Sequence, residues 1–185
     1  MNLQPTLSTE RLILRPYSLD DVPDVVRLIG DARVSDTILT VPYPYSDHDG
    51  VSWISTREVE FRSGKSANFA ITLAKSGEYI GGIGLNFNPA QNYAELGYWV
   101  GLPHWNKGYV TEAARAVVDW GFRERNLNRI LARHVLHNLA SGRVMLKIGM
   151  QYEGTLREHA HKGGVYFDMV MYGVLRREWE NTAVR

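Results

Sequence analysis

The sequence contains no cysteine. This absence excludes disulfide bonds, thiolate zinc sites and a cysteine nucleophile, and it fits the reducing cytoplasm, where we expect the protein to work. Neither sign of charge is in excess, because 21 Lys and Arg stand against 20 Asp and Glu, so bulk charge favours neither nucleic acid nor a membrane as a partner. No apolar run approaches the length of a membrane span, and the first ten residues lack the basic and apolar regions of a signal peptide.

A length of 185 residues is that of one domain, and we expect residues 1–185 to form one, without repeats or linkers. Alternating apolar residues and turn residues predict seven strands: Arg11–Arg15, Asn68–Ala74, Glu78–Phe87, Tyr93–Val100, Arg129–Leu136, Gln151–Leu156 and Val165–Leu175. The early strands pair locally, whereas the later ones alternate with helices. This order predicts an α/β fold (α+β by some conventions) with a mixed, mostly antiparallel sheet and helices on both faces.

Helix signals lie between these strands. Ser18 and Asp21 resemble a capping box ahead of a helix that Gly30 closes. The spacing of apolar residues predicts a second helix over Asp47–Arg62, after a loop that is rich in Pro and Tyr. A later helix begins at Asn138 and ends at Gly149, with a buried face expected at Ala140, Val144 and Ile148. Within the strands, Gly97 suggests a β-bulge.

The most informative stretch is PHWNKGYVTEAARAVVDWGFRER (Pro103–Arg125). A strand-like run, AELGYWV (Ala94–Val100), precedes it, and a short loop with Lys107 and Gly108 leads into an amphipathic helix. A strand, a glycine loop and a helix start aim backbone N–H groups at a phosphate, and the helix dipole favours the anion. The stretch therefore predicts a site for a phosphorylated cofactor between residues 100 and 111, although an ordinary capped helix start is the alternative.

Two other phosphate-binding motifs fit poorly. From Gly101 the sequence reads GLPHWNKG, in which Asn106 replaces the second glycine of a P-loop and Gly108 replaces its Ser or Thr. We therefore reject a P-loop. The run GGIGLNF (Gly81–Phe87) has a GxG, but Phe87 takes the place of the third glycine of a dinucleotide fingerprint and no helix follows.

Three runs, in this order, resemble the GNAT acyltransferase family: ELGYWVGLPHWNKGYVTEA (Glu95–Ala113), NLASGRVMLKIGMQYEG (Asn138–Gly154) and YFDMVMYGVLRREW (Tyr166–Trp179). The opening LSTERLILRPYSLDDV (Leu7–Val22) resembles the RimJ/RimL-type branch of ribosomal-protein N-terminal acetyltransferases. The resemblance covers nearly the whole chain. It implies the GNAT fold and an acetyl-CoA-dependent N-acetyltransferase that passes the acetyl group directly to a primary amine.

The resemblance also implies which residues hold the cofactor. In the family the loop before the long helix binds the diphosphate, and the backbone at the end of the preceding strand binds the pantetheine arm and the acetyl carbonyl. Trp105 stands where the family has Gln or Arg, and Val110 where it has a small residue, but backbone amides do most of the phosphate binding. Lys107 either contacts phosphate or is a solvated charge. The residues expected to bind acetyl-CoA are Val100, Asn106, Lys107, Gly108, Tyr109, Val110, Thr111, Asn138, Ser141 and Arg143.

The same family pattern suggests how the thiolate leaves. Asn138 matches an asparagine that contacts the cofactor arm, and it is also a favourable N-cap residue. Ser141 matches the branch's candidate for the acid that protonates the departing thiolate, or it is only a first-turn serine. The tyrosine that many members use falls at Met145, whose thioether cannot give a proton, so Ser141 or water must serve.

Nearby basic residues either favour the cofactor's phosphates or form an exposed basic face: Arg129, Arg133, Arg143 and Lys147.

The attacking amine must be the free base, and a carboxylate or a carboxylate-bound water usually removes its proton. Glu95 is the candidate base, because the branch carries Glu here. The alternative for Glu95 is a salt bridge on the surface of the strand. Glu112 lies in the first turn of the predicted helix, where an acid suits the dipole, and we interpret it as structural.

The acceptor is the least determined part. At pH 7, deprotonation costs roughly 1.4 kcal/mol for an α-amine and about 4.6 kcal/mol for a Lys side chain. A weak base therefore suffices for a protein N-terminus, which we favour as the acceptor. One alternative acceptor is a polyamine, an aminoglycoside or another small amine. Asp36, Asp47 and Asp49 would attract such a cationic substrate, or they are simply solvated. Another alternative is a non-catalytic acyl-CoA sensor.

Family analogy places Tyr43, Tyr45 and Trp53 near the acceptor groove, although they could equally be packing residues. His159 and His161 lack a recognisable further ligand set, so we expect surface or loop histidines and no metal. We expect a monomer or a homodimer.

Overall fold

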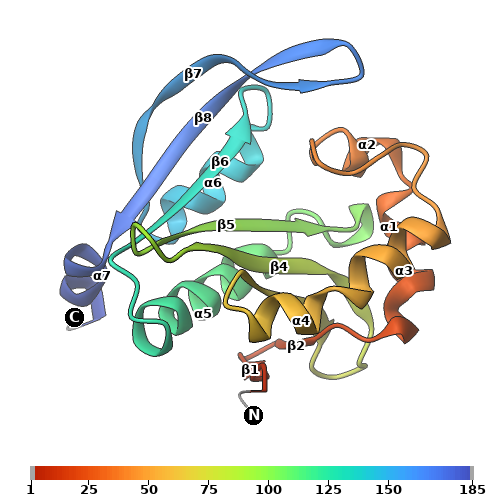
Figure 1. Cartoon of the computed structure of the whole chain (residues 1–185), viewed down its shortest axis with the longest axis horizontal. Helices are drawn as coiled ribbons and strands as arrows, with labels where there is room; N and C mark the ends of the chain where they lie inside the picture. The colour runs from red at the N-terminus through yellow and green to blue at the C-terminus, as the bar shows by residue number, and fades with distance from the viewer. Residues whose placement is uncertain (1–2, 184–185) are drawn as a thin grey trace.

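The computed structural model describes residues 3–183 and contains one eight-stranded sheet, in the order β1-β2-β3-β4-β5-β6-β8-β7 (Figure 1). The strands are β1 (Leu7–Ser8), β2 (Leu12–Pro16), β3 (Ser66–Leu73), β4 (Tyr79–Asn88), β5 (Tyr93–Val100), β6 (Arg129–Val135), β7 (Gln151–Lys162) and β8 (Val165–Leu175). All neighbouring pairs are antiparallel except β5 and β6, which are parallel. The predicted mixed, mostly antiparallel sheet is confirmed.

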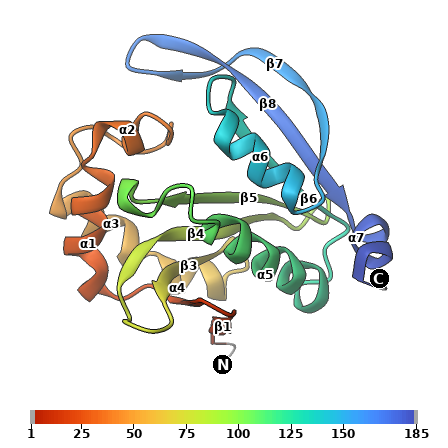
Figure 2. The same ribbon diagram turned by 180° about the vertical axis from the view of Figure 1, so that it is seen from behind.

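Helices cover both faces of this sheet, as predicted. They are η1 (Leu19–Asp21), α1 (Val22–Ile29), α2 (Ala32–Ser35), α3 (Asp47–Ser55), α4 (Arg57–Arg62), η2 (Leu102–His104), α5 (Tyr109–Glu124), α6 (Leu139–Lys147) and α7 (Arg176–Ala183). The helices α1, α3 and α4 lie in front of the sheet in Figure 1, and α5 and α6 lie on the other side, as Figure 2 shows. The larger core cluster includes Phe69, Leu85, Val117 and Phe122. Burying each such side chain contributes about 1.5–3 kcal/mol.

Capping residues set the starts of two helical segments. Ser18 and Asp21 form the predicted capping box, which begins η1 and leads into α1. Ser46 and Asp49 form a second box at the start of α3. In both boxes a serine and an acid three residues later satisfy backbone N–H groups that a helix start leaves unpaired.

The single helix predicted over Asp47–Arg62 is wrong, because the chain forms α3 and α4 with a break at Thr56. The Thr56 hydroxyl donates to the carbonyl of Trp53 at 2.9 Å. Local side-chain bonds of this kind compete with helical hydrogen bonds. The break places Trp53 at the end of one helix and Arg57 at the start of the next.

The bulge predicted at Gly97 is also wrong. Gly97 pairs in regular register with Gly84 of β4, and the irregularity in this part of the sheet lies between Ile71 and Thr72 of β3. A Cβ added at Gly97 would meet no atom within 4 Å. Glycine at this position therefore leaves open space above the strand.

The apolar face predicted for α6 is present in part, because Val144 and Ile148 pack against the larger core cluster. Gly142 and Met145 are buried, whereas Ala140 is exposed. A Cβ at Gly142 would lie 2.8 Å from the ring of His134, so the helix approaches β6 through this glycine. Helical spacing indicates an apolar face, but the close packing of α6 against β6 decides which of its residues are buried.

Four short elements and one extension were not predicted: β1, α2, η2, α7 and the part of β7 beyond Leu156. Most of β7 is exposed, and β8 pairs with it despite two irregularities in register. In Figure 1 this long hairpin arches over the end of the sheet toward α2. At its tip, Lys162 Nζ donates to the carbonyls of Ser35 and Ile38, each at 2.9 Å.

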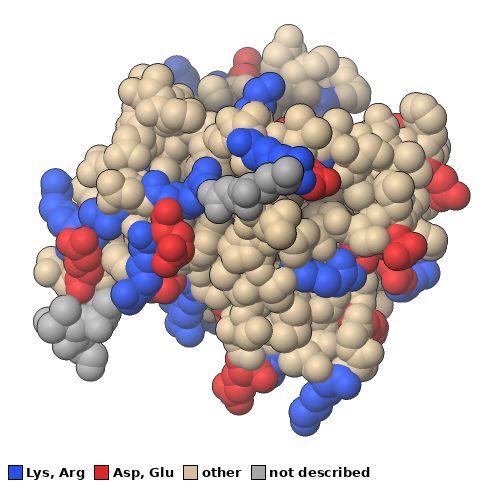
Figure 3. Space-filling model, turned by 60° about the horizontal axis from the view of Figure 1, so that its bottom comes forward, with Lys and Arg blue, Asp and Glu red and all other residues tan. Residues whose placement is uncertain are grey.

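The surface mixes both signs of charge. On the face in Figure 3, Lys and Arg side chains lie beside Asp and Glu side chains, in keeping with a net charge of +1. Within residues 3–183, no helix combines the length and the apolar character needed to cross a membrane.

Candidate active site

The strands β5 and β6 separate toward their carboxyl ends (Figure 1). They pair only where Tyr93–Glu95 lies beside Arg129–Leu131, although β5 continues to Val100. Side chains and backbone groups from both strands and from the start of α6 therefore meet at this divergence. The family resemblance assigns the pantetheine arm to this part of the fold.

The backbone of Val100 faces the divergence. The next residue, Gly101, donates its N–H to the carbonyl of Ile80 in β4 at 2.9 Å. Since alternate residues of an antiparallel strand point to opposite neighbours, the N–H and C=O of Val100 point away from β4. The Trp105 indole N–H donates to the Val100 carbonyl at 2.8 Å. This bond connects the start of the predicted phosphate loop to the end of β5.

A hydroxyl pair bridges the divergence. The Tyr98 hydroxyl lies 2.9 Å from Ser141 Oγ and 3.1 Å from the Ser141 carbonyl oxygen. Burial raises the pKa of Tyr98 to about 12, against the opposing effect of the bond to Ser141. The phenol therefore stays protonated at neutral pH and remains a hydrogen-bond donor.

The predicted phosphate loop has the backbone form that such a site needs. Asn106 and Gly108 have positive φ angles of 60° and 80°, and Gly108 is the N-cap of α5 without a side-chain cap bond. Within the described chain, the first amides of α5, at Tyr109 to Thr111, precede the first helical hydrogen bond, from Glu112 to Gly108. Residues 105–108 are exposed. Backbone donors and the helix dipole thus favour an anion here.

Glu112 is structural, as predicted. Its Oε1 accepts from Thr9 Oγ1 at 2.6 Å and from the Arg11 backbone N–H at 2.8 Å, and its Oε2 accepts from Arg11 Nε at 2.6 Å. Burial acts to raise the pKa of Glu112, but these hydrogen bonds outweigh it and hold the pKa below its usual value.

The predicted N-cap role of Asn138 is confirmed, since its side chain accepts from the backbone N–H of Ser141 at 3.2 Å. Arg143 lies exposed on α6. The structure does not support the suggestion that Arg129 and Arg133 favour the cofactor's phosphates. Their side chains pair with the carboxylates of Glu153 and Glu95, on the face of β6 opposite to the one that α6 covers.

Glu95 is the last residue of β5 that pairs with β6, where its partner is Leu131, and its partner on β4 is Asn86. Its Oε1 accepts from Arg133 Nε at 2.7 Å. Arg133 Nη1 in turn lies 3.4 Å from His159 Nε2. The carboxylate of Glu95 therefore forms the salt bridge of one interpretation and also lies beside the groove described next.

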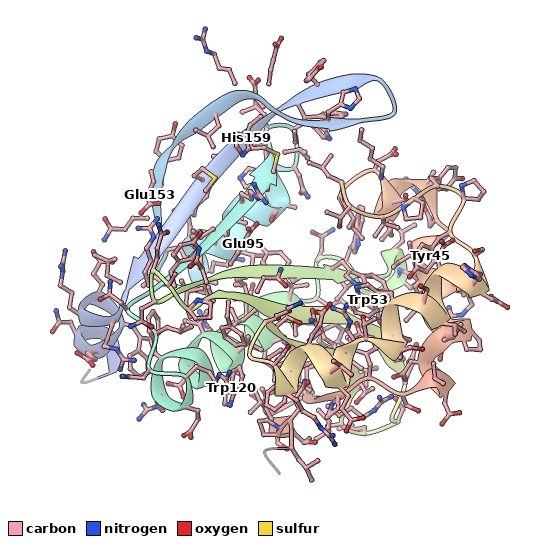
Figure 4. All side chains as sticks on the ribbon, viewed as in Figure 1. Tyr45, Trp53, Glu95, Trp120, Glu153 and His159 are labelled. Atoms are coloured by element: carbon pink, nitrogen blue, oxygen red, sulfur yellow. The ribbon has the colours of Figure 1, made fainter. Side chains whose placement is uncertain are left out.

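A groove of about 540 Å³ runs along β4 and β5 beneath α3 and the loop that follows α2. Gly97, Trp99 and Asn86 line it. Glu95 shares a face of β5 with Gly97 and Trp99. Tyr98 lines the groove as well, so the groove adjoins the divergence between β5 and β6. In Figure 4, Glu95 lies toward the start of β5, and Trp53 and Tyr45 lie toward its end.

Tyr45 and Trp53 line this groove, whereas Tyr43 is largely exposed. Trp53 also packs, because its ring stands edge-on to Tyr17 at 4.8 Å and lies under the guanidinium of Arg57 at 4.4 Å. Trp53 is therefore a packing residue that also lines the groove. Among residues 3–183, no cluster of three or more His, Asp or Glu side chains could hold a metal ion.

Three residues near the site were missed by the sequence analysis. Tyr98 was part of a strand, and only the approach of α6 to β5 reveals its bond to Ser141. The space above Gly97 depends on helices that cover the sheet elsewhere. Arg11 is 96 residues from Lys107, whose carbonyl accepts from Arg11 Nη1 at 3.0 Å. No local pattern carries this information.

Comparisons with known proteins agree with this geometry. A family model described as an acetyltransferase (GNAT) domain matches residues 11–151. The uncharacterised N-acetyltransferase p20 of Bacillus licheniformis is 33% identical over 177 residues, which cover 94% of this chain and 98% of that protein. A GNAT-family acetyltransferase structure from Bacillus anthracis has a TM-score of 0.84 at 28% identity and covers 94% of this chain and 99% of that one. The structure of RimL, a ribosomal L7/L12 α-N-protein acetyltransferase in complex with coenzyme A, has a TM-score of 0.85 at 19% identity and covers 92% of this chain and 98% of that one.

The chain belongs to the GNAT acetyltransferase family. It has the mixed α/β fold of that family and is an acetyl-CoA-dependent N-acetyltransferase.

Proposed function

We propose that the acceptor is the α-amino group of a protein N-terminus, of the ribosomal-protein type found in the RimJ/RimL branch. The fold that the chain shares with the L7/L12 N-terminal acetyltransferase supports this proposal. So does the lower cost of deprotonating an α-amine relative to a Lys side chain. A cytoplasmic location goes with such an acceptor, and we propose it as well.

The observation that carries the proposal is the balance of charge in the groove. Its lining includes one acid, Asp49, and one guanidinium, Arg57. Asp49 accepts hydrogen bonds from the backbone and the hydroxyl of Ser46, and Arg57 pairs with Glu60 at 3.0 Å. A polyamine or an aminoglycoside carries several positive charges and needs several unpaired acids. The groove suits an acceptor whose one charge is the amine.

The floor of the groove suits an extended chain. Gly82 and Gly84 of β4 and Gly97 of β5 lie side by side in register with their neighbours. The side chains of Tyr17 and Asn68 already occupy the space above the first two glycines, whereas the space above Gly97 is open. The amino end of a peptide would lie over Gly97, between the aromatic residues and Glu95.

In the proposed reaction Glu95, directly or through water, accepts the proton of the amine, and the backbone N–H of Val100 stabilises the oxyanion of the tetrahedral intermediate. The loop from Asn106 to Thr111 holds the diphosphate of acetyl-CoA. Ser141, with Tyr98 behind it, donates a proton or a hydrogen bond to the departing thiolate. Lys107, Asn138 and Arg143 are further proposed contacts to the cofactor.

The hydroxyl pair yields a test of the leaving-group step. We expect Tyr98→Phe and Ser141→Ala each to lower kcat about 10-fold, since Ser141→Ala removes the proposed hydrogen bond to the developing thiolate and Tyr98→Phe removes the hydrogen bond that orients Ser141. The double variant should fall no further than the worse single one, because the two hydroxyls act as one unit. The Kd for acetyl-CoA should stay within about twofold, and steady-state kinetics and calorimetry measure both quantities.

Tyr152→Phe is the matched control, because the Tyr152 hydroxyl also bonds a second hydroxyl, Thr155 Oγ1, at 3.1 Å, but on the exposed hairpin. It should leave kcat unchanged. Additive losses in the Tyr98 and Ser141 double variant would show that the hydroxyls act separately.

The acceptor itself is tested by a competition assay. The protein, acetyl-CoA with a labelled acetyl group and an equimolar mixture of N-terminal ribosomal-protein peptides, spermidine and an aminoglycoside are incubated together, and mass spectrometry locates the label. We expect it on peptide α-amines. Label on spermidine or the aminoglycoside would overturn the proposed acceptor, and tight acetyl-CoA binding without any labelled amine would favour an acyl-CoA sensor.

A further inference from the structure

Arg11 links the amino-terminal part of the chain to the predicted diphosphate loop. Its Nη1 donates to the Lys107 carbonyl at 3.0 Å, its Nε donates to Glu112 at 2.6 Å, and its guanidinium lies 4.8 Å from the ring centre of Tyr109. The Arg11 side chain therefore contacts the loop at Lys107 and the first turn of α5 at Tyr109 and Glu112. We propose that Arg11 is a positioning residue that holds this loop in the form that binds the diphosphate of acetyl-CoA. The inference rests on the assignment of the diphosphate to this loop.

The loop needs such support because of its backbone. Asn106 and Gly108 lie in the left-handed region, with Lys107 between them. A left-handed conformation is unfavourable for a residue with a Cβ such as Asn106, and it persists only where neighbouring groups hold it. The hydrogen bond from Arg11 to the Lys107 carbonyl fixes the peptide unit that joins Lys107 to Gly108. The amides on either side then keep their direction.

Charge gives a second reason. Glu112 places a carboxylate in the first turn of α5, close to where the phosphates would bind. The carboxylate of Glu112 would repel a bound phosphate. A cation that pairs with this carboxylate offsets the repulsion. Arg11 pairs with Glu112 by its side chain and by its backbone N–H, and Thr9 adds a third hydrogen bond. Arg11 therefore offsets the negative charge of Glu112 and keeps positive charge beside the loop.

One nitrogen of Arg11 remains beside the loop. Nη2 lies 3.5 Å from the position that a Cβ on Gly108 would occupy, and within the described chain no hydrogen bond uses it. The Arg11 side chain is 44% exposed, so the guanidinium is reached from solvent.

The test separates the diphosphate from the rest of the donor. Acetyl-CoA is compared with S-acetyl-pantetheine, which carries the same thioester arm and no phosphate. For Arg11→Ala we expect KM for acetyl-CoA to rise about 10-fold with kcat within about twofold, and kinetic constants for S-acetyl-pantetheine to stay unchanged. Arg11→Lys should recover only part of the loss, because a single ammonium group cannot reproduce the two hydrogen bonds that the planar guanidinium makes to Lys107 and Glu112.

Arg123→Ala is the matched control, since Arg123 is a surface arginine near the far end of α5 that pairs with Asp119 at 3.0 Å. It should leave both donors unaffected. Equal losses with both donors, or an unchanged KM for acetyl-CoA in Arg11→Ala, would overturn the role of Arg11. If wild-type protein used both donors with the same KM, the assignment of the diphosphate to the loop would fail instead, whatever the variants show.

Discussion

Glu95→Gln should lower kcat about 100-fold at pH 7, because the amide keeps a hydrogen bond to Arg133 but cannot accept the proton of the attacking amine. The Kd for acetyl-CoA should not change. The defect should shrink as pH rises above about 8, since an α-amine then loses its proton to solvent without a base. Initial rates from pH 6.5 to 9.5 with a saturating peptide measure this trend.

Glu153→Gln is the control for the loss of a carboxylate. Glu153 pairs with Arg129 on the same sheet, with side-chain exposures of 34% and 29%, close to the 29% and 39% of Glu95 and Arg133. Figure 4 shows the two glutamates on different strands. If both variants lose the same small factor, Glu95 is a structural ion pair and water is the base.

Gly97→Val should lower kcat/KM for the acceptor about 100-fold, since its side chain fills the open space above β5 and displaces the amine from the acetyl group. The fold should not suffer. Gly97 has a regular strand register and a Cβ there meets no atom within 4 Å, and a β-branched residue suits a strand better than glycine. The thermal midpoint should therefore stay the same or rise.

A size series gives this prediction its control. Gly97→Ala should show an intermediate loss, whereas the Kd for acetyl-CoA should be constant through Gly, Ala and Val. Activity that does not depend on the size of residue 97 would place the acceptor elsewhere. A loss of acetyl-CoA binding in step with side-chain size would instead place the thioester, rather than the amine, over this glycine.

Local sequence signals were reliable where the cause is local. The capping box at Ser18 and Asp21, the N-cap at Asn138 and the helix that follows Gly108 depend on neighbouring residues, and all three are present. The prediction of a helix through Thr56 was wrong because apolar spacing does not report a hydroxyl that competes for a helical carbonyl. Gly97 was misread for a similar reason, since a glycine that serves a bulge and one that leaves space look the same in a sequence.

The sequence by itself determined the seven longer strands, the glycine loop at a helix start and the absence of thiol chemistry, because each depends on residue type and short spacing. Only the tertiary structure decided that Tyr98 meets Ser141, that Arg11 meets Lys107 and that open space lies above Gly97. These relations join residues that are far apart in the chain. Sheet pairing and helix packing bring them together, and no periodicity along one segment encodes the distance between two.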